Sequence, residues 1–429
     1  MTSLVARVLS PRRGEHRATT RPLRAVMPFQ AARTLGGRGA YLGRETSGSA
    51  FCYDPFDLVE RGLLSGPAML VLGEIGRGKS SLVKAYLHRQ VGVFGRRGVV
   101  ISPKRGEYDR LAEAFGVEPL RLRPGGTLRL NPLDTGRARG GEARLRALRG
   151  VAAATLARPL TPAEDAALAQ TLHALDPALS RVVTLPGVVS ALLDPLPEAW
   201  AGRWRSRDEW LDETRECALS LDRLVSGAAR GMFDAETTAS VSVNAPLVVV
   251  DLSEVADSAA IAILMTAALA WIHAQIAAES DEVHAKRIVV CDEAWRVLSN
   301  LAAAEALLDA TKHSRAYGIQ PITIVHKITD LAASGDEGTR LSRIADGLLS
   351  DAETKVVFAQ PDDQVPLARE RLGLTTTEAS LLPMLGRGEA LWRVGTRSAL
   401  VTHQLSEREH AICDTNQRMR SIPSGKDAT

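Results

Sequence analysis

One segment, Gly73–Ser80, restricts the possible folds of this chain more than any other part of it. It reads GEIGRGKS, which matches the pattern GxxxxGK[ST], and it lies between an apolar, strand-like run at 68–72 and a helix-like run. Glycines at this spacing let backbone N–H groups converge on phosphate oxygens, and the positive end of the following helix adds to the attraction. The segment therefore predicts a phosphate-binding loop within a βαβ unit.

Within this loop, Lys79 can reach the β and γ phosphates of a nucleotide, and the Ser80 hydroxyl can ligate Mg²⁺. We therefore expect ATP and Mg²⁺ as cofactors. Glu74 brings a negative charge close to the phosphates, and we expect its side chain to point to solvent. A glycine-rich turn without a ligand is the alternative. The candidate nucleotide-binding residues are Gly73, Glu74, Ile75, Gly76, Arg77, Gly78, Lys79, Ser80 and Ser81.

A second signal is the segment RIVVCDEAW at 287–295, in which a β-branched run ends in two acids. A phosphate-binding loop needs a carboxylate at the end of a neighbouring strand to hold Mg²⁺, and Asp292 suits that role. It also needs a carboxylate that polarises the attacking water, and Glu293 suits that one. Strands ending in Asp-Glu are common, so a solvated strand end is the alternative, and the motif gains its weight from the glycine loop.

A third group of candidates surrounds a strand predicted at 321–325. We expect this strand beside the one ending in Asp292, so that His326 at its tip contacts the γ-phosphate or the catalytic water. The alternative is a loop histidine with a backbone partner. Arg315 precedes the strand, where a ring ATPase can present an arginine to a neighbouring subunit's nucleotide, and an ordinary surface charge is the alternative. The candidate catalytic residues are thus Glu293, Lys79, His326 and Arg315.

The chain divides into four zones by pattern. They are a basic N-terminal segment and lead-in (1–64), the first part of a P-loop NTPase core (65–135), an all-helical insertion (136–240) and the second part of the core (241–429). The lead-in ends in a short helix-like stretch at 51–67, closed by Gly and Pro.

The strand and helix signals predict an α/β fold. A mostly parallel core sheet would be built from strands at 68–72, 98–102, 247–251, 287–292 and 321–325. In the insertion, Thr161 and Glu164 form a helix-start signature with the proline between them. Near the C-terminal end, a β-hairpin is predicted to turn at Gly395–Thr396.

The charge of the chain is unevenly distributed. Its net charge of +3 does not by itself argue for nucleic acid. Residues 1–50, however, carry nine arginines against Glu15 and Glu45, which indicates either a solvated tail or a docking segment for a partner, an acidic lipid surface or DNA. The four cysteines are scattered without metal-ligand spacing, a pattern typical of reduced thiols in a cytoplasm.

The uncharged run at 259–278 is long enough to span a bilayer. It lies between two strand-like segments of the same predicted sheet, and a membrane span there would put those strands on opposite sides of the bilayer. We therefore predict a buried crossover helix and no transmembrane segment.

Taken together, these motifs resemble a known family. GEIGRGKSS, VVISPKRGEYDRLAEAFG, LRLNPLD, VVCDEAW, HSRAYGIQPITIVHKITDL and LGRGEALWRVGTR occur in the order found in HerA/FtsK-superfamily ring motors. The chain is most similar to conjugation and type IV secretion ATPases of the VirB-four class. The resemblance implies a RecA-like core, ATP hydrolysis at subunit interfaces and hexameric rings at the inner face of the membrane. It assigns Arg315 to a segment whose basic residues can act across the interface, with Arg387 as a second candidate.

Three features depart from the family pattern. Relatives usually carry Asp at the position of Ser102, and they often carry Gln at the position of His326. Neutral and protonated imidazole would affect the γ-phosphate differently, so hydrolysis is expected to acquire a different rate or pH dependence. Relatives also usually carry a long N-terminal domain, whereas a short basic segment precedes the motor here.

These observations leave three functions open. The first is an ATP-hydrolysing ring motor that powers transfer of DNA or protein across the cell envelope, with conjugation or secretion components as partners and a cytoplasmic or peripheral membrane location. The second is a DNA translocase of the coupling-protein or FtsK kind. The third is a nucleotide-switched assembly scaffold with little turnover, against which the presence of both Asp292 and Glu293 argues.

Overall fold

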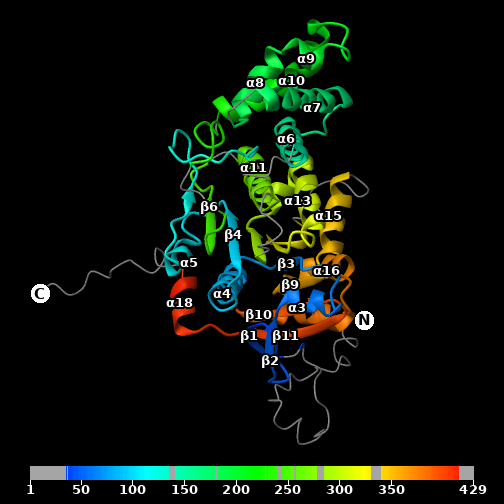
Figure 1. Ribbon diagram of the computed structural model, residues 1–429. Coiled ribbons are helices and arrows are strands. Elements are labelled where there is room, and N and C mark those ends of the chain that lie inside the picture. The colour runs from blue at the N-terminus through cyan, green and yellow to red at the C-terminus, as the bar shows by residue number, and fades with distance from the viewer. Residues whose placement is uncertain are drawn as a thin grey trace, which may run out of the picture.

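A computed structural model gives the arrangement of the chain (Figure 1). It describes residue 35 and residues 37–134, 141–178, 182–227, 229–238, 243–255, 258–277, 285–329 and 340–414. Most of the basic segment predicted at 1–64 therefore lies outside the described residues. The described strands form one sheet of eleven, in the order β2-β1-β11-β10-β9-β3-β8-β7-β4-β6-β5.

The strands from β9 to β5 in that order are all parallel. They are β3 (Met69–Leu72), β4 (Arg97–Ser102), β5 (Leu120–Arg121), β6 (Leu247–Asp251), β7 (Arg287–Cys291), β8 (Ile319–Val325) and β9 (Thr354–Phe358). The predicted parallel core is confirmed. One expectation is wrong, because β8 lies between β3 and β7, and the P-loop strand is therefore not a direct neighbour of the strand that ends at the acids.

The other four strands extend the sheet beyond β9 in antiparallel pairs. Strands β10 (Glu389–Val394) and β11 (Arg397–His403) form the predicted hairpin, and β1 (Ala40–Glu45) and β2 (Ala50–Tyr53) form a second one beside β11. The helix-like prediction from residue 51 is wrong for its first three residues. Phe51 and Tyr53 pack their rings 4.9 and 5.2 Å from that of Trp392, and helix α3 (Pro55–Glu60) begins only after its cap, Asp54.

Helices cover both faces of the sheet, which gives three layers (Figure 1). Because side chains alternate along a strand, Leu70 and Leu72 of β3 enter one core and Met69 and Val71 enter the other. The second core is closed by α4 (Lys79–Gly92), α5 (Asp109–Ala114) and α18 (Glu407–Cys413), and the first by α11 (Ser258–Ala277), α12 (Trp295–Leu298), α13 (Leu301–His313) and α15 (Arg340–Asp351). Helices α16 (Val365–Leu372) and α17 (Thr376–Leu381) lie between β9 and β10 in the chain.

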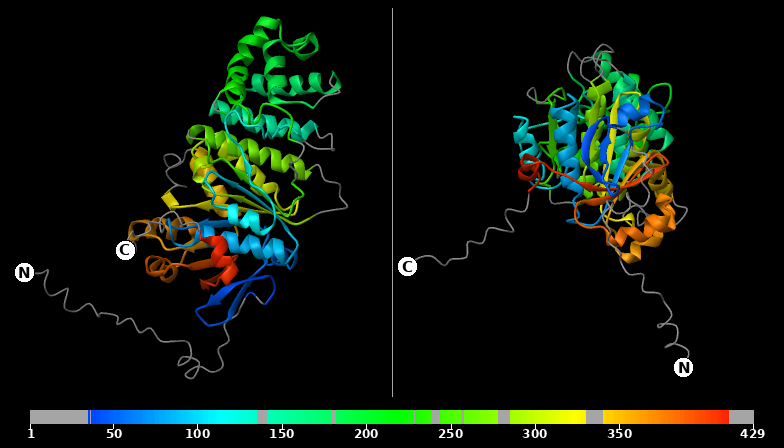
Figure 2. Two further views of the ribbon diagram at one scale, coloured as in Figure 1. Left: turned by 90° about the vertical axis from the view of Figure 1, so that its left-hand side faces the viewer. Right: turned by 90° about the horizontal axis from the view of Figure 1, so that it is seen from below.

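Every helix or strand assigned within the described residues of the predicted insertion is a helix, and turns and irregular segments connect these helices. Its helices are α6 (Gly141–Leu156), α7 (Pro162–Ala178), α8 (Leu185–Leu193), α9 (Pro197–Trp200) and α10 (Arg207–Ser226). The Thr161 hydroxyl accepts from the Glu164 amide at 3.1 Å, and the Glu164 carboxylate accepts from the Thr161 amide at 2.8 Å, so the predicted capping pair is confirmed. Helix α6 packs on α11 and α13, whereas α7 to α10 extend away from the sheet (Figure 2).

Helix α11 is the crossover predicted at 259–278. It follows β6 and precedes β7, which lie on either side of β4 in the sheet. Trp271 and Ile272 in its second half are almost completely buried. Among the described residues, no helix is long and apolar enough to cross a membrane.

Candidate nucleotide-binding site

The glycine loop joins the end of β3 to the start of α4, as the sequence predicted. Gly73 and Gly78 have φ of 154° and 116°, a region that disfavours other residues. A Cβ at Gly73 would lie 2.4 Å from the Cβ of Phe358 on β9, so the close approach of the two segments also requires glycine there. Within the described part of the chain, no side chain caps the first turn of α4, whose N–H groups are thus suited to an anion.

Lys79 and Glu74 are both held within the loop. The buried Lys79 ammonium donates to the carbonyl oxygens of Gly73 and, at 2.9 Å, of Glu74. The Glu74 carboxylate is paired with Arg77 at 2.8 Å rather than simply pointing to solvent, which corrects the expectation. Since Arg77 neutralises it, this carboxylate repels a bound phosphate less than its position in the sequence suggests.

The two acids lie at the end of β7, on the same edge of the sheet as the loop. Pairing of β3 with β8 brings Leu72 opposite Val325, and pairing of β8 with β7 brings Thr323 opposite Cys291. Strand β8 thus separates the glycine loop at the end of β3 from the acids at the end of β7. His326, which follows β8, lies between the loop and the acids. Glu293 has φ of 55°, a conformation that non-glycine residues adopt mostly under local constraint and often at functional sites.

Asp292 is completely buried and surrounded by polar groups. Its Oδ2 accepts weak hydrogen bonds from Ser102 and Tyr108, each at 3.4 Å, and the Lys104 ammonium lies 3.6 Å from its Oδ1. Burial raises the pKa of Asp292, and the positive charge of Lys104 opposes that rise. Ser102 thus keeps a contact to Asp292 without adding a further negative charge.

Glu293 accepts from three donors. The Nε2–H of His326 donates at 2.6 Å, and the Lys104 ammonium and the Trp295 indole N–H also contact the carboxylate. Burial raises the pKa of Glu293, but the bonds from His326 and Lys104 outweigh it and lower that pKa to about 2. Because the carboxylate is ionised and only accepts, Nε2 of His326 carries a hydrogen.

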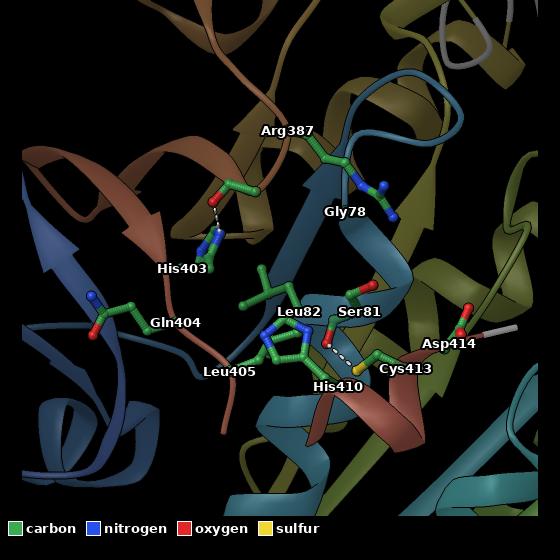
Figure 3. A pocket seen from close by; sticks show the side chains of 11 residues that line it. Gly78, Ser81, Leu82, Arg387, His403, Gln404, Leu405, His410, Cys413 and Asp414 are labelled. Carbon is green, nitrogen blue, oxygen red and sulfur yellow. Dashed lines mark hydrogen bonds between the residues drawn. The ribbon is translucent and has the colours of Figure 1, made fainter. Parts of the chain in front are cut away.

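Two cavities flank the glycine loop. One of about 770 Å³ lies beside Gly78 and Ser81 and is closed by the C-terminal segment from β11 to α18 (Figure 3). The other, of about 720 Å³, lies between residues 74–77 of the loop, Trp295 and His326. Arg387 lines both cavities.

The wall of the first cavity at His403 is uncharged. Burial lowers the pKa of His403 to about 4, so its ring is neutral at pH 7. That ring accepts from the Trp392 indole at 2.9 Å and donates to the Gly388 carbonyl at 2.9 Å, which fixes its tautomer. His403 therefore gives this cavity one neutral, ordered wall next to the start of α4.

Comparison with known proteins gives a consistent picture of the fold. No family model and no curated protein matches the sequence. The solved structure of VirB4 of Thermoanaerobacter pseudethanolicus matches with a TM-score of 0.66 and 20% identity, over 88% of this chain and 99% of that one. The chain has the fold of VirB4. The conjugative coupling protein TrwB also matches, with a TM-score of 0.59 and 15% identity over 91% of this chain and 93% of that one, and TrwB bound to ADP and Mg²⁺ matches with a TM-score of 0.57 and 13% identity over 87% and 94%.

In this VirB4-like fold the two candidate arginines lie far apart. Arg387 lies next to its own loop, where the amide of Gly388 donates to the Arg77 carbonyl at 2.9 Å (Figure 3). Arg315 precedes β8 and donates to the Ser65 carbonyl at 2.9 Å, at the opposite edge of the sheet. A seven-residue strand spans roughly 20 Å, so Arg315 lies outside the site of its own chain. Its role across an interface stays a prediction.

The residues present suit a magnesium nucleotide. Among the described residues, no group of three or more His, Cys, Asp or Glu side chains could hold a metal by itself. Mg²⁺ is usually held by one or two protein oxygens together with phosphates, and the assignment of Ser80 and Asp292 to this role stays a prediction. The glycine loop suits phosphates, because it leads into the first turn of α4, whose N–H groups carry no side-chain cap from the described residues.

Sequence reasoning missed three side chains of the site. Lys104 and Tyr108 lie on the segment after β4 and contact the acids, and Trp295 contacts Glu293 from the start of α12. The motif that contains Lys104 was visible in the sequence, but nothing local to it indicates which strand end it faces. That information comes from the pairing of β4 with β7.

Proposed function

We propose that this chain is an ATP-hydrolysing motor subunit of the conjugation and type IV secretion kind, powering transfer of DNA or protein across the cell envelope. The observation that carries the proposal is the meeting, at one sheet edge, of the glycine loop, a buried acid pair and His326 between them. The fold shared with VirB4 over nearly its whole length supports the same assignment.

In the proposed mechanism, the loop and the first turn of α4 hold the phosphates, and Lys79 turns from the loop carbonyls to the transferred group. Ser80 and Asp292 would hold Mg²⁺, which would supply positive charge to the phosphoryl oxygens. Arg387 adds charge from the C-terminal side. The nucleoside half is assigned to the cavity of about 770 Å³ beside Gly78, and the γ-phosphate end to the side of His326.

Glu293 is assigned to orienting the attacking water. A carboxylate whose pKa is about 2 is a weak proton acceptor near neutral pH, because the best general base has a pKa near the working pH. The hydrogen bond to His326 positions the carboxylate beside the γ-phosphate end of the site. Loosening of its donor contacts during turnover would make it a stronger base.

We further propose that the subunits form a ring, hexameric as in the resembled motors, in which Arg315 faces the nucleotide of a neighbouring subunit. Components of a secretion or conjugation apparatus are the proposed partners, and the proposed place is the inner face of the cell membrane. The position of Arg315 at the far edge of its own sheet supports an action in trans.

The test is phosphate release from ATP as a function of protein concentration, with wild type and Lys79→Ala. The proposal expects a specific activity that rises steeply with concentration, since the site needs a neighbour, and that disappears in the variant. Wild-type phosphate release no higher than that of Lys79→Ala would refute an ATPase. A rate per molecule independent of concentration would refute the shared site.

A DNA translocase of the coupling-protein kind is the second candidate function, supported by the fold shared with TrwB. It expects that duplex DNA stimulates ATP hydrolysis and that added salt strongly weakens the effect, because phosphate contacts release counterions. A rate of ATP hydrolysis that DNA does not change would count against the DNA translocase. It would not affect the proposal of a secretion-type motor.

A further inference from the structure

One ammonium group bridges the two acids of the site. Lys104 Nζ contacts the carboxylate of Glu293 and lies 3.6 Å from Oδ1 of Asp292. Of the lysine and arginine side chains among the described residues, that of Lys104 forms the ion pairs with these acids. The Lys79 ammonium instead donates to the carbonyl oxygens of its own loop. The Lys104 ammonium therefore neutralises the two carboxylates at the position that the proposed function assigns to Mg²⁺.

The segment that carries Lys104 is tied both to the acids and to the P-loop helix. The amide of Lys104 donates to the Ser102 hydroxyl at 3.2 Å, and that hydroxyl contacts Asp292. Three residues further on, the Glu107 carboxylate pairs at 2.9 Å with the completely buried ammonium of Lys84 on α4. A change at the start of α4 thus has a direct connection to the segment that holds Lys104.

Lys104 also has room to move. About a third of its side chain, 32%, is exposed, whereas the side chains of Asp292 and Glu293 are 0% and 6% exposed. Burial of two adjacent carboxylates without a counter-charge is strongly unfavourable. An ammonium and a divalent cation beside the same carboxylates repel each other, so they occupy that place in turn.

We propose that Lys104 is an exchangeable counter-ion of the acid pair, which holds Glu293 before the nucleotide binds and leaves it when Mg²⁺ and nucleotide arrive. This inference rests on the proposed function. It makes Lys104 a positioning residue, since it acts on Glu293 and not on the reacting phosphate.

The first test measures how fast each lysine of the wild-type chain is acetylated, followed by peptide mass spectrometry, with and without Mg²⁺ and a non-hydrolysable ATP analogue. The inference expects acetylation of Lys104 to rise several-fold with the ligand, acetylation of Lys79 to fall, and acetylation of the exposed Lys312 to stay constant as the internal reference. A fall in Lys79 labelling without a rise at Lys104 overturns the inference and leaves the proposed function intact. No change at Lys79 overturns both.

The second test measures Mg²⁺ binding without nucleotide, by calorimetry, in Lys104→Met. Removing the competing charge should strengthen Mg²⁺ binding about tenfold or more. Lys104→Arg, which keeps the charge, and Arg105→Met, which removes an exposed charge from the same loop, should both bind Mg²⁺ as wild type does. Equal affinity in Lys104→Met and Arg105→Met overturns the inference. Should Lys104→Met fail to fold, the labelling of wild type decides.

Discussion

Replacing Glu293 by Gln tests the contribution of the negative charge of this carboxylate to stability and activity. Glutamine keeps the length of the side chain and an oxygen that can accept from His326 and Trp295, but it carries no charge for Lys104. The contacts in the folded chain lower the pKa of Glu293 from 4.5 to about 2. At about 1.4 kcal/mol per pKa unit, the ionised carboxylate stabilises the fold by about 3 kcal/mol at pH 7, and the variant loses that contribution.

The sign of this effect sets its pH dependence. A carboxylate whose pKa is lowered on folding contributes its full stabilisation above pH 4.5, and that contribution declines as the pH falls toward 2. The difference in unfolding free energy between wild type and Glu293→Gln should therefore be about 3 kcal/mol at pH 7 and roughly half of that at pH 3. Urea unfolding followed by tryptophan fluorescence at the two pH values measures it.

The same variant should keep ATP bound and lose phosphate release by a factor of about 10² to 10⁴, since the water is no longer oriented. The matched control is Glu370→Gln at an exposed position, where the change in stability should stay within about 0.5 kcal/mol. A stability difference that is absent at pH 7, or that does not shrink toward pH 3, would refute the charge contacts as its origin. Unchanged turnover would remove Glu293 from the mechanism.

The other predictions concern residues at the margins of the site. Arg387→Ala should weaken ATP binding about tenfold in an equilibrium titration, because an ionic hydrogen bond is lost, and an unchanged dissociation constant would exclude that contact. Mixing Arg315→Ala with Lys79→Ala subunits should restore part of the activity, and no rescue at any ratio would exclude Arg315 from acting in trans. Burial raises the pKa of Glu409 on α18, but the bond from Arg89 helps to lower it to about 2. Glu409→Gln should therefore cost about 3 kcal/mol at pH 7 and less as the pH falls below 4.5, measured by urea unfolding, and equal costs at pH 7 and pH 3 would contradict this origin.

Much of the fold was predictable because its signals are local. The parallel strands are buried on both faces, so each of them reads as an unbroken apolar run, as in β3 and β6. The glycine loop needs particular backbone conformations, and these require glycine at fixed positions such as Gly73 and Gly78. The Thr161 cap involves residues three apart in the chain. Each of these features depends on residues that are close together in the sequence.

Features that depend on which strands pair were not accessible in this way. The first hairpin, β1 and β2, joins the sheet through β11, more than 350 residues later. The residues of β2 from Phe51 onward were predicted as the start of a helix-like stretch. The insertion of β8 between β3 and β7 likewise follows from the packing of the crossovers and not from any motif.

The sequence by itself determined the chemistry of the individual parts: a loop that can bind phosphate, a strand that ends in two acids, and a histidine at the tip of another strand. Only the tertiary structure decided how these parts meet. It brought Lys104 to the acids and Arg387 to the loop, and it separated Arg315 from both. The physical reason is that backbone conformation depends on neighbouring residues, whereas the field at a buried carboxylate depends on every charge that the fold brings near it.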